Sequence, residues 1–482
     1  MKKKICFRAD AGVQTGYGHF IRTLALADML KDDFDCVFYT VDPSPYQLQE
    51  LQKVCPCVTL KAETRLEDFL DCLEGTETVV LDNYFYTSDY QQAIKARGCR
   101  LVCIDDMHDR HYYADIVINH AYGSRLKDYS TEPYTQVCLG LPYALLRKPF
   151  LETGRQEEKR NSILICFGGV DACNLTCKTL HSLEHELNGY QVEIIVGNAF
   201  MYKEELVQLA ANHSNYKIHT ALNAEDMAGV MNRSHVAVLS ASSVLWEAIF
   251  SGCHVIYGYY VDNQMDICRN VGTNETLGIT CIGDLRTVSE QSMHESFKRI
   301  SAEGGRPVFR KPDVKSRYLQ LFRSEVTVRE ARKEDAMLYF EWANDPVVRQ
   351  MAFHTEHIPW EDHRAWFGRK IDAADSLLLL CYKDGQPVGQ VRFDLTDRQE
   401  AEIDISVAQE HRGKGIGEAM LDAAMAYAQD TKGYDCFIAE VKNANISSRR
   451  MFSAEGFKQT GITGGISHFK KIVHNGFDSQ TL

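Results

Sequence analysis

A strand-to-helix turn near the front of the chain constrains the fold more than any other stretch. The apolar run 5–7 is typical of a strand, and the small and polar residues of RADAGVQTGYG follow it. From Phe20 onward, apolar residues return at helical spacing, so a helix should begin directly after the turn. The first N–H groups of such a helix lack partners, and together with the helix dipole they attract phosphate or another anion. We therefore expect an anion-binding site at this connection.

The same turn carries candidates for substrate binding and proton transfer. Gly16 and Gly18 let the backbone approach a ligand closely. His19 has the side chain whose unperturbed pKa, about 6.5, suits proton transfer near neutral pH. Asp10 and Arg22 flank it. From the residues alone, an ordinary strand–helix connection in which His19 caps or packs is the alternative.

The stretch RADAGVQTGYGHFIRTLALA resembles the signature of the nucleotide-sugar hydrolases of pseudaminic acid biosynthesis, which remove UDP from a diacetamido-trideoxy-altrose. The resemblance implies two Rossmann-like lobes of the B-type glycosyltransferase fold, which these hydrolases share with the MurG-like transferases. It also implies three catalytic residues. His19 would be the general base, Tyr84 would line the sugar site in a D-x-Y pattern at a strand end, and Asn263 would contact the sugar near the attacking water.

Length and composition limit the number of domains, the class of protein and the kinds of partner. A chain of 482 residues predicts about three domains, and 45% hydrophobic with 25% charged residues is ordinary for a globular protein. The formal net charge of -13 argues against nucleic-acid binding. The 16 cysteines lack zinc-site spacing, and no signal peptide is recognisable, so we expect reduced structural thiols, no metal and a cytoplasmic protein. No apolar run approaches the ~20 residues that cross a bilayer, so no membrane partner is expected.

Short apolar strands alternate with helical patterns through residues 1–152, the expected first lobe. The strands are expected at 36–40, 78–86, 100–106 and 115–119. This alternation predicts a parallel sheet covered on both faces, which binds ligands at the carboxyl ends of its strands. Strand-end capping is the alternative for the polar residues there, and for Asp105 and Asp106 it is as good as ligand binding. The polar residues that follow these strands are Asp82, Asn83, Tyr84, Asp105, Asp106, Asn119 and His120.

A second Rossmann-like lobe is expected at 153–324. The polar run 152–161 has the charge and the lack of periodicity of an exposed linker. After it, the strand, glycine turn and helix pattern starts again. Gly168 and Gly169 end a strand where a phosphate could approach. The second lobe should therefore hold the UDP.

The stretch 235–264 supports a nucleotide-sugar site. A strand runs into Ser242 and Ser243 at a helix start, where the hydroxyls can add donors around a diphosphate, and Glu247 lies one helical turn further on the same face. The resemblance implies that Glu247 binds the ribose hydroxyls of UDP and that Gln264 belongs to the family's NQ pair. SASSVLWE departs from the family pattern, which has more glycine and often threonine at the place of Val244.

The residues 325–482 predict a third domain. SLLLLCYKDGQPVGQVRFDL is typical of a hairpin with DGQP as its turn. Further on, Ile403, Ile405 and Val407 alternate with polar residues, as in a half-buried strand, and RGKGIG at 412–417 precedes a long amphipathic helix. Successive N–H groups in this turn can hold a pyrophosphate, to which Arg412 or Lys414 adds charge.

Together with NANISSRRMFSAEGF at 443–457, this pattern resembles the GNAT acetyltransferases, and WANDP resembles the member that acetylates the 4-amino sugar in pseudaminic acid synthesis. The resemblance implies a GNAT α/β domain with acetyl-CoA as co-substrate. It implies that 405–407 pair with the pantetheine arm, that 412–417 hold the pyrophosphate and that Asn445 contacts coenzyme A. The acetyl-CoA residues are thus Ile405, Ser406, Val407, Arg412, Gly413, Lys414, Gly415, Ile416, Gly417 and Asn445.

One position departs from the acetyltransferase pattern. Many GNAT enzymes use a tyrosine as general acid where this chain has Phe452, which cannot donate a proton. Another donor or water would then serve, or the thiolate would leave unprotonated. Glu402 and Asp404 are candidates to relay the proton from the sugar ammonium, and solvation of the strand face explains them equally well.

The two resemblances cover nearly the whole chain and concern adjacent steps of one pathway. We therefore predict a bifunctional enzyme that N-acetylates a UDP-4-amino-4,6-dideoxy sugar and hydrolyses the product to UDP and free sugar. Its expected partners are a UDP-linked amino sugar and acetyl-CoA, and the sequence carries no signal for an oligomeric state. The alternatives are a B-type glycosyltransferase, a nucleotide-sugar binding module without chemistry, and a GNAT domain that modifies a protein N-terminus or another amine.

Overall fold

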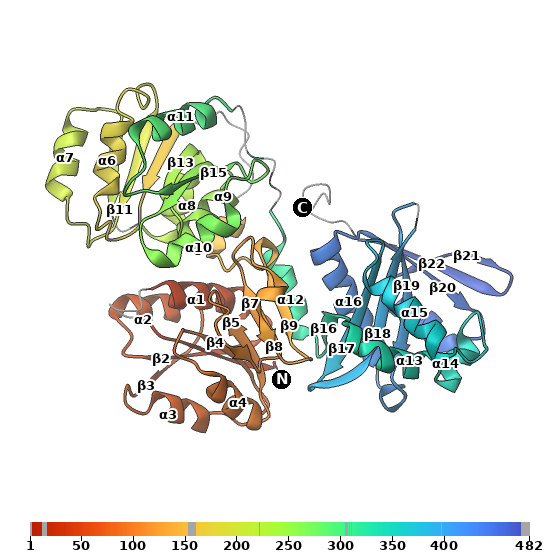
Figure 1. Cartoon of the computed structure of the whole chain (residues 1–482). Coiled ribbons are helices and arrows are strands. Elements are labelled where there is room, and N and C mark those ends of the chain that lie inside the picture. Colours follow the sequence, from red (N-terminus) through yellow and green to blue (C-terminus); the bar gives the residue numbers. More distant parts are fainter. Residues whose placement is uncertain are drawn as a thin grey trace.

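The computed structural model describes residues 2–11, 17–152, 161–220, 222–303, 307, 309, 311–396 and 398–473. The chain forms three parts, each built around one large sheet (Figure 1). The first two sheets are parallel and the third is largely antiparallel. The predicted mixed α/β class is therefore confirmed.

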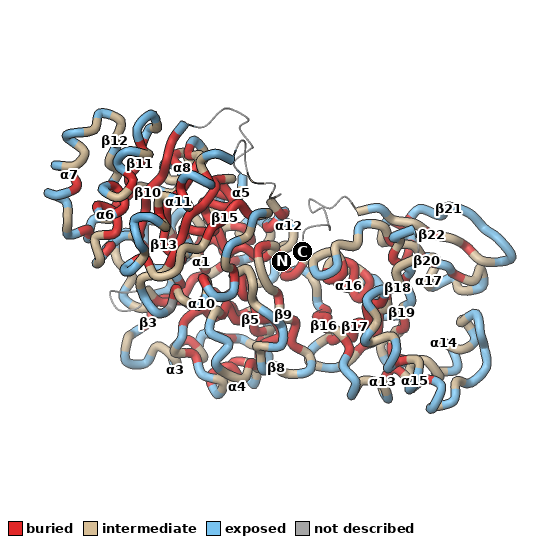
Figure 2. The backbone as a smooth tube through the Cα atoms, turned by 45° about the horizontal axis from the view of Figure 1, so that its top comes forward, coloured by how far each residue is buried: buried red, intermediate tan, exposed pale blue. Residues whose placement is uncertain are grey.

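The first lobe is a doubly wound sheet in the order β3-β2-β1-β4-β5-β7-β9. Short apolar strands are buried on both faces by helices, and Figure 2 shows the strands as the buried centre. The strands are β1 (Lys4–Ala9), β2 (Asp35–Val41), β3 (Cys57–Leu60), β4 (Thr78–Asp82), β5 (Arg100–Ile104), β7 (Ile116–Asn119) and β9 (Gln136–Leu139), and β6 (His111–Tyr112) pairs with β8 (Ser130–Thr131). The helices are α1 (Gly18–Leu30), α2 (Pro45–Gln52), α3 (Arg65–Asp71) and α4 (Ser88–Ala96).

The second lobe repeats this plan in the order β12-β11-β10-β13-β14-β15. Its strands are β10 (Ser162–Cys166), β11 (Gln191–Val196), β12 (Tyr216–Thr220), β13 (Ser234–Ser240), β14 (His254–Tyr259) and β15 (Ile279–Asp284). The helices are α5 (Lys148–Glu152), α6 (Leu175–Ser182), α7 (Lys203–Ala211), α8 (Ala224–Arg233), α9 (Ser243–Phe250), α10 (Asp262–Val271) and α11 (Glu290–Ser301). Since β10, β13 and β14 are neighbours, their carboxyl ends meet at one edge of the sheet.

Helix α12 (Val314–Arg323) follows the second lobe in sequence but packs against α1 of the first lobe. The Tyr318 hydroxyl donates a hydrogen bond to the Tyr143 carbonyl at 2.7 Å, and Arg100 Nη1 donates to the Ser324 carbonyl at 2.6 Å. In Figure 1, α12 lies between the first lobe and the third domain. Helix α12, which falls in the expected second lobe at 153–324, thus packs on the first lobe. The domain boundaries stay a prediction.

The third domain has the strand order β16-β17-β18-β19-β20-β22-β21. Helix α16 covers one face of the sheet, and α13 and α15 cover the other. Its strands are β16 (Thr327–Glu330), β17 (Ser376–Lys383), β18 (Gln386–Leu395), β19 (Ala401–Val407), β20 (Cys436–Lys442), β21 (Lys458–Thr463) and β22 (Ile466–Ile472). The helices are α13 (Ala336–Ala343), α14 (Pro346–Met351), α15 (Trp360–Ile371), α16 (Ile416–Lys432) and α17 (Ile446–Ala454).

The hairpin turn of the third domain is shorter than predicted. Asp384 and Gly385 have positive φ angles of 50° and 75°, and Lys383 pairs directly with Gln386. This is the two-residue turn that Asp-Gly favours, since its twist matches that of the strands. The prediction of a DGQP turn was therefore wrong for Gln386 and Pro387, which belong to β18.

The third domain contacts the edge of the first lobe through backbone and side-chain groups of β16. Val328 donates its peptide N–H to Gln136 Oε1 at 3.1 Å, and Thr327 Oγ1 donates to the Tyr134 carbonyl at 2.8 Å. Arg329 Nε donates to the Pro133 carbonyl at 2.6 Å. These bonds fix the third domain on the first lobe.

All sixteen cysteines fall in the described residues, and none of them forms a disulfide. Within the described ranges, no group of His, Cys, Asp and Glu side chains has a metal-binding arrangement. Among the helices described, none combines the length and apolar character that a bilayer span requires.

Candidate functional site

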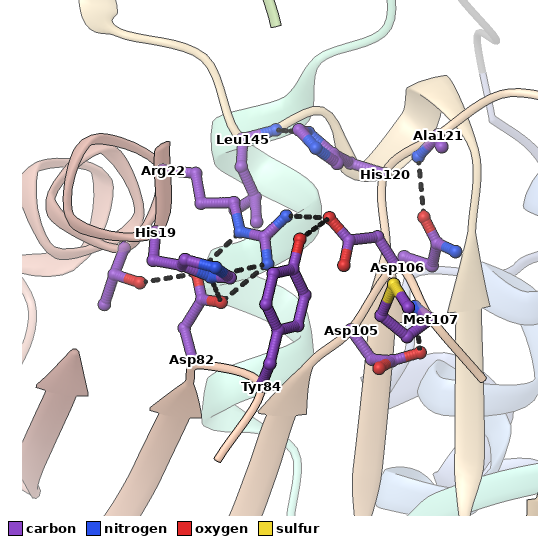
Figure 3. A network of polar contacts seen from close by, with 12 residues as sticks. His19, Arg22, Asp82, Tyr84, Asp105, Asp106, Met107, His120, Ala121 and Leu145 are labelled. Atoms are coloured by element: carbon purple, nitrogen blue, oxygen red, sulfur yellow. Dashed lines mark hydrogen bonds and ion pairs between the residues drawn. The ribbon is translucent and has the colours of Figure 1, made fainter. Parts of the chain in front are cut away.

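The front-lobe site begins with a histidine–carboxylate pair. His19 lies in the first turn of α1, is 5% exposed, and has Nδ1 2.7 Å from Asp82 Oδ1 (Figure 3). Asp82 ends β4, which pairs with β1, so the sheet brings the two residues together. An Nδ1–H that donates to Asp82 leaves the lone pair of Nε2 as the basic position of the ring. The pair therefore has the geometry of a general base with its orienting carboxylate.

Arg22 ties this pair to a second carboxylate. Its Nε and Nη2 donate to the two oxygens of Asp82 at 2.6 Å each, and its Nη1 donates to Asp106 Oδ2 at 2.7 Å. Thr23 Oγ1 also donates to Asp82, at 2.9 Å. Asp82 is fully buried, so these bonds satisfy a carboxylate that water does not reach.

The charge of Arg22 decides the ionisation of both carboxyl groups. Burial raises the pKa of Asp82, but the Arg22 guanidinium outweighs burial and holds that pKa below its ordinary value. The pKa of Asp106 is lowered in the same way, against its own burial. Both groups are therefore anionic at neutral pH, and Asp82 can stabilise an imidazolium on His19.

Tyr84 completes the group at the surface. Its ring, 46% exposed, meets the His19 ring edge-on with 4.4 Å between centroids, and its hydroxyl donates to Asp106 Oδ2 at 3.3 Å. Burial and the charge of Asp106 raise the pKa of Tyr84, so the phenol stays protonated. Figure 3 shows His19, Arg22, Tyr84 and Asp106 pointing toward one another.

Asp10, by contrast, is engaged inside the sheet. Its carboxylate accepts hydrogen bonds from Arg8 and from the peptide N–H of Val41, the latter at 2.8 Å, while its own N–H donates to Asn83 Oδ1 at 2.7 Å. These contacts stabilise the ends of β1, β2 and β4. Gly18 opens α1, and Gly16 lies outside the described residues.

The other strand-end residues of the first lobe have structural partners, and two of them, Asp105 and Asn119, cap local turns. Asp105 accepts the N–H of His108 at 2.8 Å, and Asn119 accepts that of Ala121 at 2.9 Å. His120 accepts the N–H of Leu145 at 3.2 Å, and burial and the nearby Arg22 lower its pKa to about 4. His120 is therefore neutral near pH 7.

The second-lobe candidates gather at the shared carboxyl edge of β10, β13 and β14. Gly168 follows β10 with a φ of 89°, and Gly169 follows it. Ser242 is the N-cap residue of α9 and Ser243 its first residue. Gln264 lies in α10, where its Oε1 accepts the N–H of Tyr260 at 3.1 Å; Asn263 is in the same helix, with its side chain outside the described part.

Glu247 is held by a residue that sequence reasoning did not select. Arg147 donates from Nε and Nη2 to Glu247 Oε1 at 3.1 and 2.8 Å, which joins the segment that leaves the first lobe to α9. Burial raises the pKa of Glu247, and Arg147 opposes this rise without cancelling it. Because 100 residues separate the two along the chain, no local pattern could have paired them.

In the third domain a cavity of about 1140 Å³ lies between β19 and β20. The two strands pair in parallel at Ala401–Phe437 and Glu402–Ile438 and then diverge. Nine of the ten predicted acetyl-CoA residues line the cavity, and Lys414 is not among the described lining residues. The lining members are Ile405, Ser406, Val407, Arg412, Gly413, Gly415, Ile416, Gly417 and Asn445.

The loop that precedes α16 is built for close approach of a ligand. Gly413 and Gly415 have φ angles of 72° and 75°, which other residues rarely adopt, and no other atom lies within 4 Å of where a Cβ would stand on either residue. Arg412 donates from Nε to the Val407 carbonyl at 3.0 Å and lies 2.9 Å from Asp345. The residues present thus fit the pyrophosphate of acetyl-CoA.

Phe452 and Asn445 have local structural partners as well. The Phe452 ring, 2% exposed, stacks on Phe469 with 5.8 Å between centroids and meets Phe457 edge-on at 5.1 Å. Asn445 Oδ1 accepts the N–H of Ser448 and caps α17. Phe452 is therefore a core residue that also lines the cavity.

The lowered pKa values of Asp82 and Asp106 predict a loss of stability in acid. A carboxyl group whose pKa is lower in the folded chain than in the unfolded chain stabilises the fold at pH values above its unfolded pKa of about 3.9. This stabilisation is lost as the pH falls through the pKa of the folded chain. Thermal unfolding midpoints between pH 6 and 3 should therefore fall more steeply in the native chain than in the Asp82→Asn variant. Equal slopes would contradict this assignment.

Comparison with known proteins gives matches to both ends of the chain. Residues 325–458 match the acetyltransferase (GNAT) domain family. The chain is 28% identical over 271 residues to the UDP-2,4-diacetamido-2,4,6-trideoxy-beta-L-altropyranose hydrolase of Campylobacter jejuni, which covers 54% of this chain and 93% of that protein. It is 24% identical over 322 residues to the spore coat polysaccharide biosynthesis protein SpsG of Bacillus subtilis, a match that covers 62% of this chain and 92% of that protein. An uncharacterised protein of Methanocaldococcus jannaschii is 25% identical over 492 residues, which cover 95% of this chain and 97% of that protein.

Proposed function

Because this chain joins a front half homologous to a UDP-sugar hydrolase to a C-terminal GNAT acetyltransferase domain, we propose that it catalyses two consecutive steps of pseudaminic acid biosynthesis. The third domain transfers an acetyl group from acetyl-CoA to the 4-amino group of a UDP-4-amino-4,6-dideoxy sugar that already carries an acetamido group at C2. The two lobes then hydrolyse the resulting UDP-2,4-diacetamido-2,4,6-trideoxy sugar. The products are UDP and the free diacetamido sugar.

The observation that carries the hydrolytic half is the His19–Asp82 pair. His19 Nε2 takes a proton from water, whose oxygen forms a bond to the anomeric carbon. The bond between that carbon and the UDP oxygen breaks, and UDP leaves with the electron pair. Asp82, 2.7 Å from Nδ1, stabilises the imidazolium, and the N-terminus of α9 at Ser242 and Ser243 stabilises the diphosphate.

The acetyl transfer is supported by the cavity between β19 and β20 and by the glycine loop before α16. The amine nitrogen forms a bond to the thioester carbonyl carbon, and the bond from that carbon to sulfur breaks. The ammonium loses one proton to solvent before the attack and a second as the amide forms, so the amide keeps one N–H. The coenzyme A thiolate accepts one proton from water, since Phe452 has no proton to give. Residues 405–407 and 412–417 bind and orient the thioester.

Product analysis tests both halves of this proposal. The pure chain, given the UDP-4-amino sugar and acetyl-CoA without a sugar acceptor, should produce free coenzyme A, UDP and the free diacetamido sugar by mass spectrometry. Without acetyl-CoA, UDP release should be much slower. Acetylated UDP-sugar that accumulates until an acceptor is added would identify a glycosyltransferase, and binding without turnover would identify a module without chemistry.

A further inference from the structure

His120 is a buried histidine of the first lobe that no step above uses. Strand β7 pairs with β5, and β5 pairs with β4, so the carboxyl ends of the three strands bring Asp82, Asp106 and His120 to the same edge of the sheet. Figure 3 shows the His120 ring next to Arg22 and Asp106, whose charges both act on its pKa. His120 is 8% exposed, so it lies within the front-lobe site rather than on the surface around it.

The contacts of His120 fix which ring nitrogen carries the proton. The Leu145 N–H donates to Nδ1 at 3.2 Å, so Nδ1 holds a lone pair and the neutral ring has its proton on Nε2. A second proton on the ring would set two N–H groups against each other, and burial together with Arg22 lowers the pKa of His120 to about 4. His120 is therefore a neutral donor at pH 7. Its Nε2–H finds no hydrogen-bond acceptor among the described residues.

Asp106, at the same edge, has an oxygen that lacks a donor. Its Oδ2 accepts from Arg22 Nη1 at 2.7 Å and from the Tyr84 hydroxyl at 3.3 Å. Its Oδ1 is buried and accepts no hydrogen bond within the described part of the chain. A buried polar atom in this state costs free energy, and a ligand that supplies the matching group removes that cost. The edge thus offers a ligand one N–H donor and one carboxylate acceptor.

The charge around His120 favours a neutral ligand group over a phosphate. Asp82 and Asp106 are both anionic and share the guanidinium of Arg22, so these three side chains together carry a net negative charge. That charge repels a phosphate. A secondary amide is uncharged, and its carbonyl oxygen and its N–H match the donor of His120 and the acceptor of Asp106.

We propose that His120 Nε2 donates a hydrogen bond to the carbonyl oxygen of an acetamido group on the sugar. The substrate proposed for the two lobes carries two such groups, and the N–H of the bound group is the donor that Asp106 Oδ1 lacks. The inference rests on the proposed hydrolysis and adds a specificity-determining residue to it. His120 binds the substrate and transfers no proton, and the first lobe selects a sugar that bears an acetamido group over one that bears a hydroxyl.

Two substitutions separate the donor of His120 from its bond to Leu145. His120→Asn puts an amide oxygen near the position of Nδ1, where it can accept the Leu145 N–H, but it has no donor at the position of Nε2. His120→Gln brings an amide N–H to the position of Nε2 and lacks the acceptor near Leu145. The substrates are the UDP-diacetamido sugar and two analogues in which a hydroxyl replaces either the 2-acetamido or the 4-acetamido group. UDP release from each is measured by chromatography.

The native chain should have a kcat/KM about 10-fold higher for the diacetamido substrate than for one of the two analogues. His120→Asn should abolish this preference with its unfolding temperature unchanged, and His120→Gln should keep most of it. Release of the coenzyme A thiol in the acetyl transfer should be native in both variants.

The inference is overturned, while the proposed hydrolysis stands, by a native chain that releases UDP from all three substrates equally well. A preference that survives in His120→Asn, or a loss in His120→Gln as large as in His120→Asn, has the same meaning, because the donor is then not what selects the substrate. A native chain that releases no UDP from any of the three overturns the hydrolysis and the inference together.

Discussion

His19→Asn is expected to lower the rate of UDP release by about 10²- to 10⁴-fold, the range that a positioned general base contributes. Asparagine keeps a hydrogen-bonding group near Asp82, but it supplies no basic nitrogen where Nε2 of the imidazole lies. Acetyl transfer should continue at the native rate, because His19 lies in the first lobe and the acetyl-CoA cavity in the third domain. UDP release measured by chromatography and thiol release measured in the same samples separate the two activities.

The control for this experiment is His185→Asn, which changes an exposed histidine of the second lobe. It should leave both activities at the native level. If His19→Asn still releases UDP at the native rate, His19 is not the base and the proposed hydrolytic mechanism fails, whatever the homology of the front half.

Asp82→Asn is expected to destabilise the chain by about 3 kcal/mol as well as to suppress UDP release. Asp82 is fully buried and takes two hydrogen bonds from Arg22 and one from Thr23. Its neutralisation leaves Asp106 as the charge partner of that guanidinium among the described residues. Urea denaturation at pH 7 measures the loss in the free energy of unfolding.

Asp89→Asn is the matched control, since Asp89 is an exposed carboxylate in the first turn of α4. Its effect on stability should stay below about 1 kcal/mol, the size of a helix-dipole interaction. An Asp82→Asn variant as stable as this control would show that the buried charge pair contributes little to the fold.

The sequence could predict the parts of the fold that depend on local patterns. The turn before His19 and the alternation from Ile403 to Val407 follow from the spacing of apolar residues over a few positions, and α1 and β19 are where this spacing puts them. The hairpin turn was less predictable. The turn consists of Asp384 and Gly385 alone, and Pro387, which the sequence placed in the turn, is a paired residue of β18.

The assembly of the site could be predicted only in part. Asp82 and Asp106 were recognisable as strand-end residues, but their common partner Arg22 lies 60 and 84 positions away. Asp10 flanks the same turn and yet bonds to Arg8 within the sheet, because its carboxylate reaches the buried guanidinium two residues before it. Which of several nearby polar residues turns toward the ligand depends on three-dimensional packing, which spacing in sequence does not specify.

The return of α12 to the first lobe has a mechanical consequence. The third domain is bonded to the first lobe through β16 and directly follows α12, so these elements make one platform. The second lobe is connected to that platform by the chain at both of its ends. Any rotation of the second lobe relative to this platform would therefore leave the contacts between the first lobe and the third domain intact.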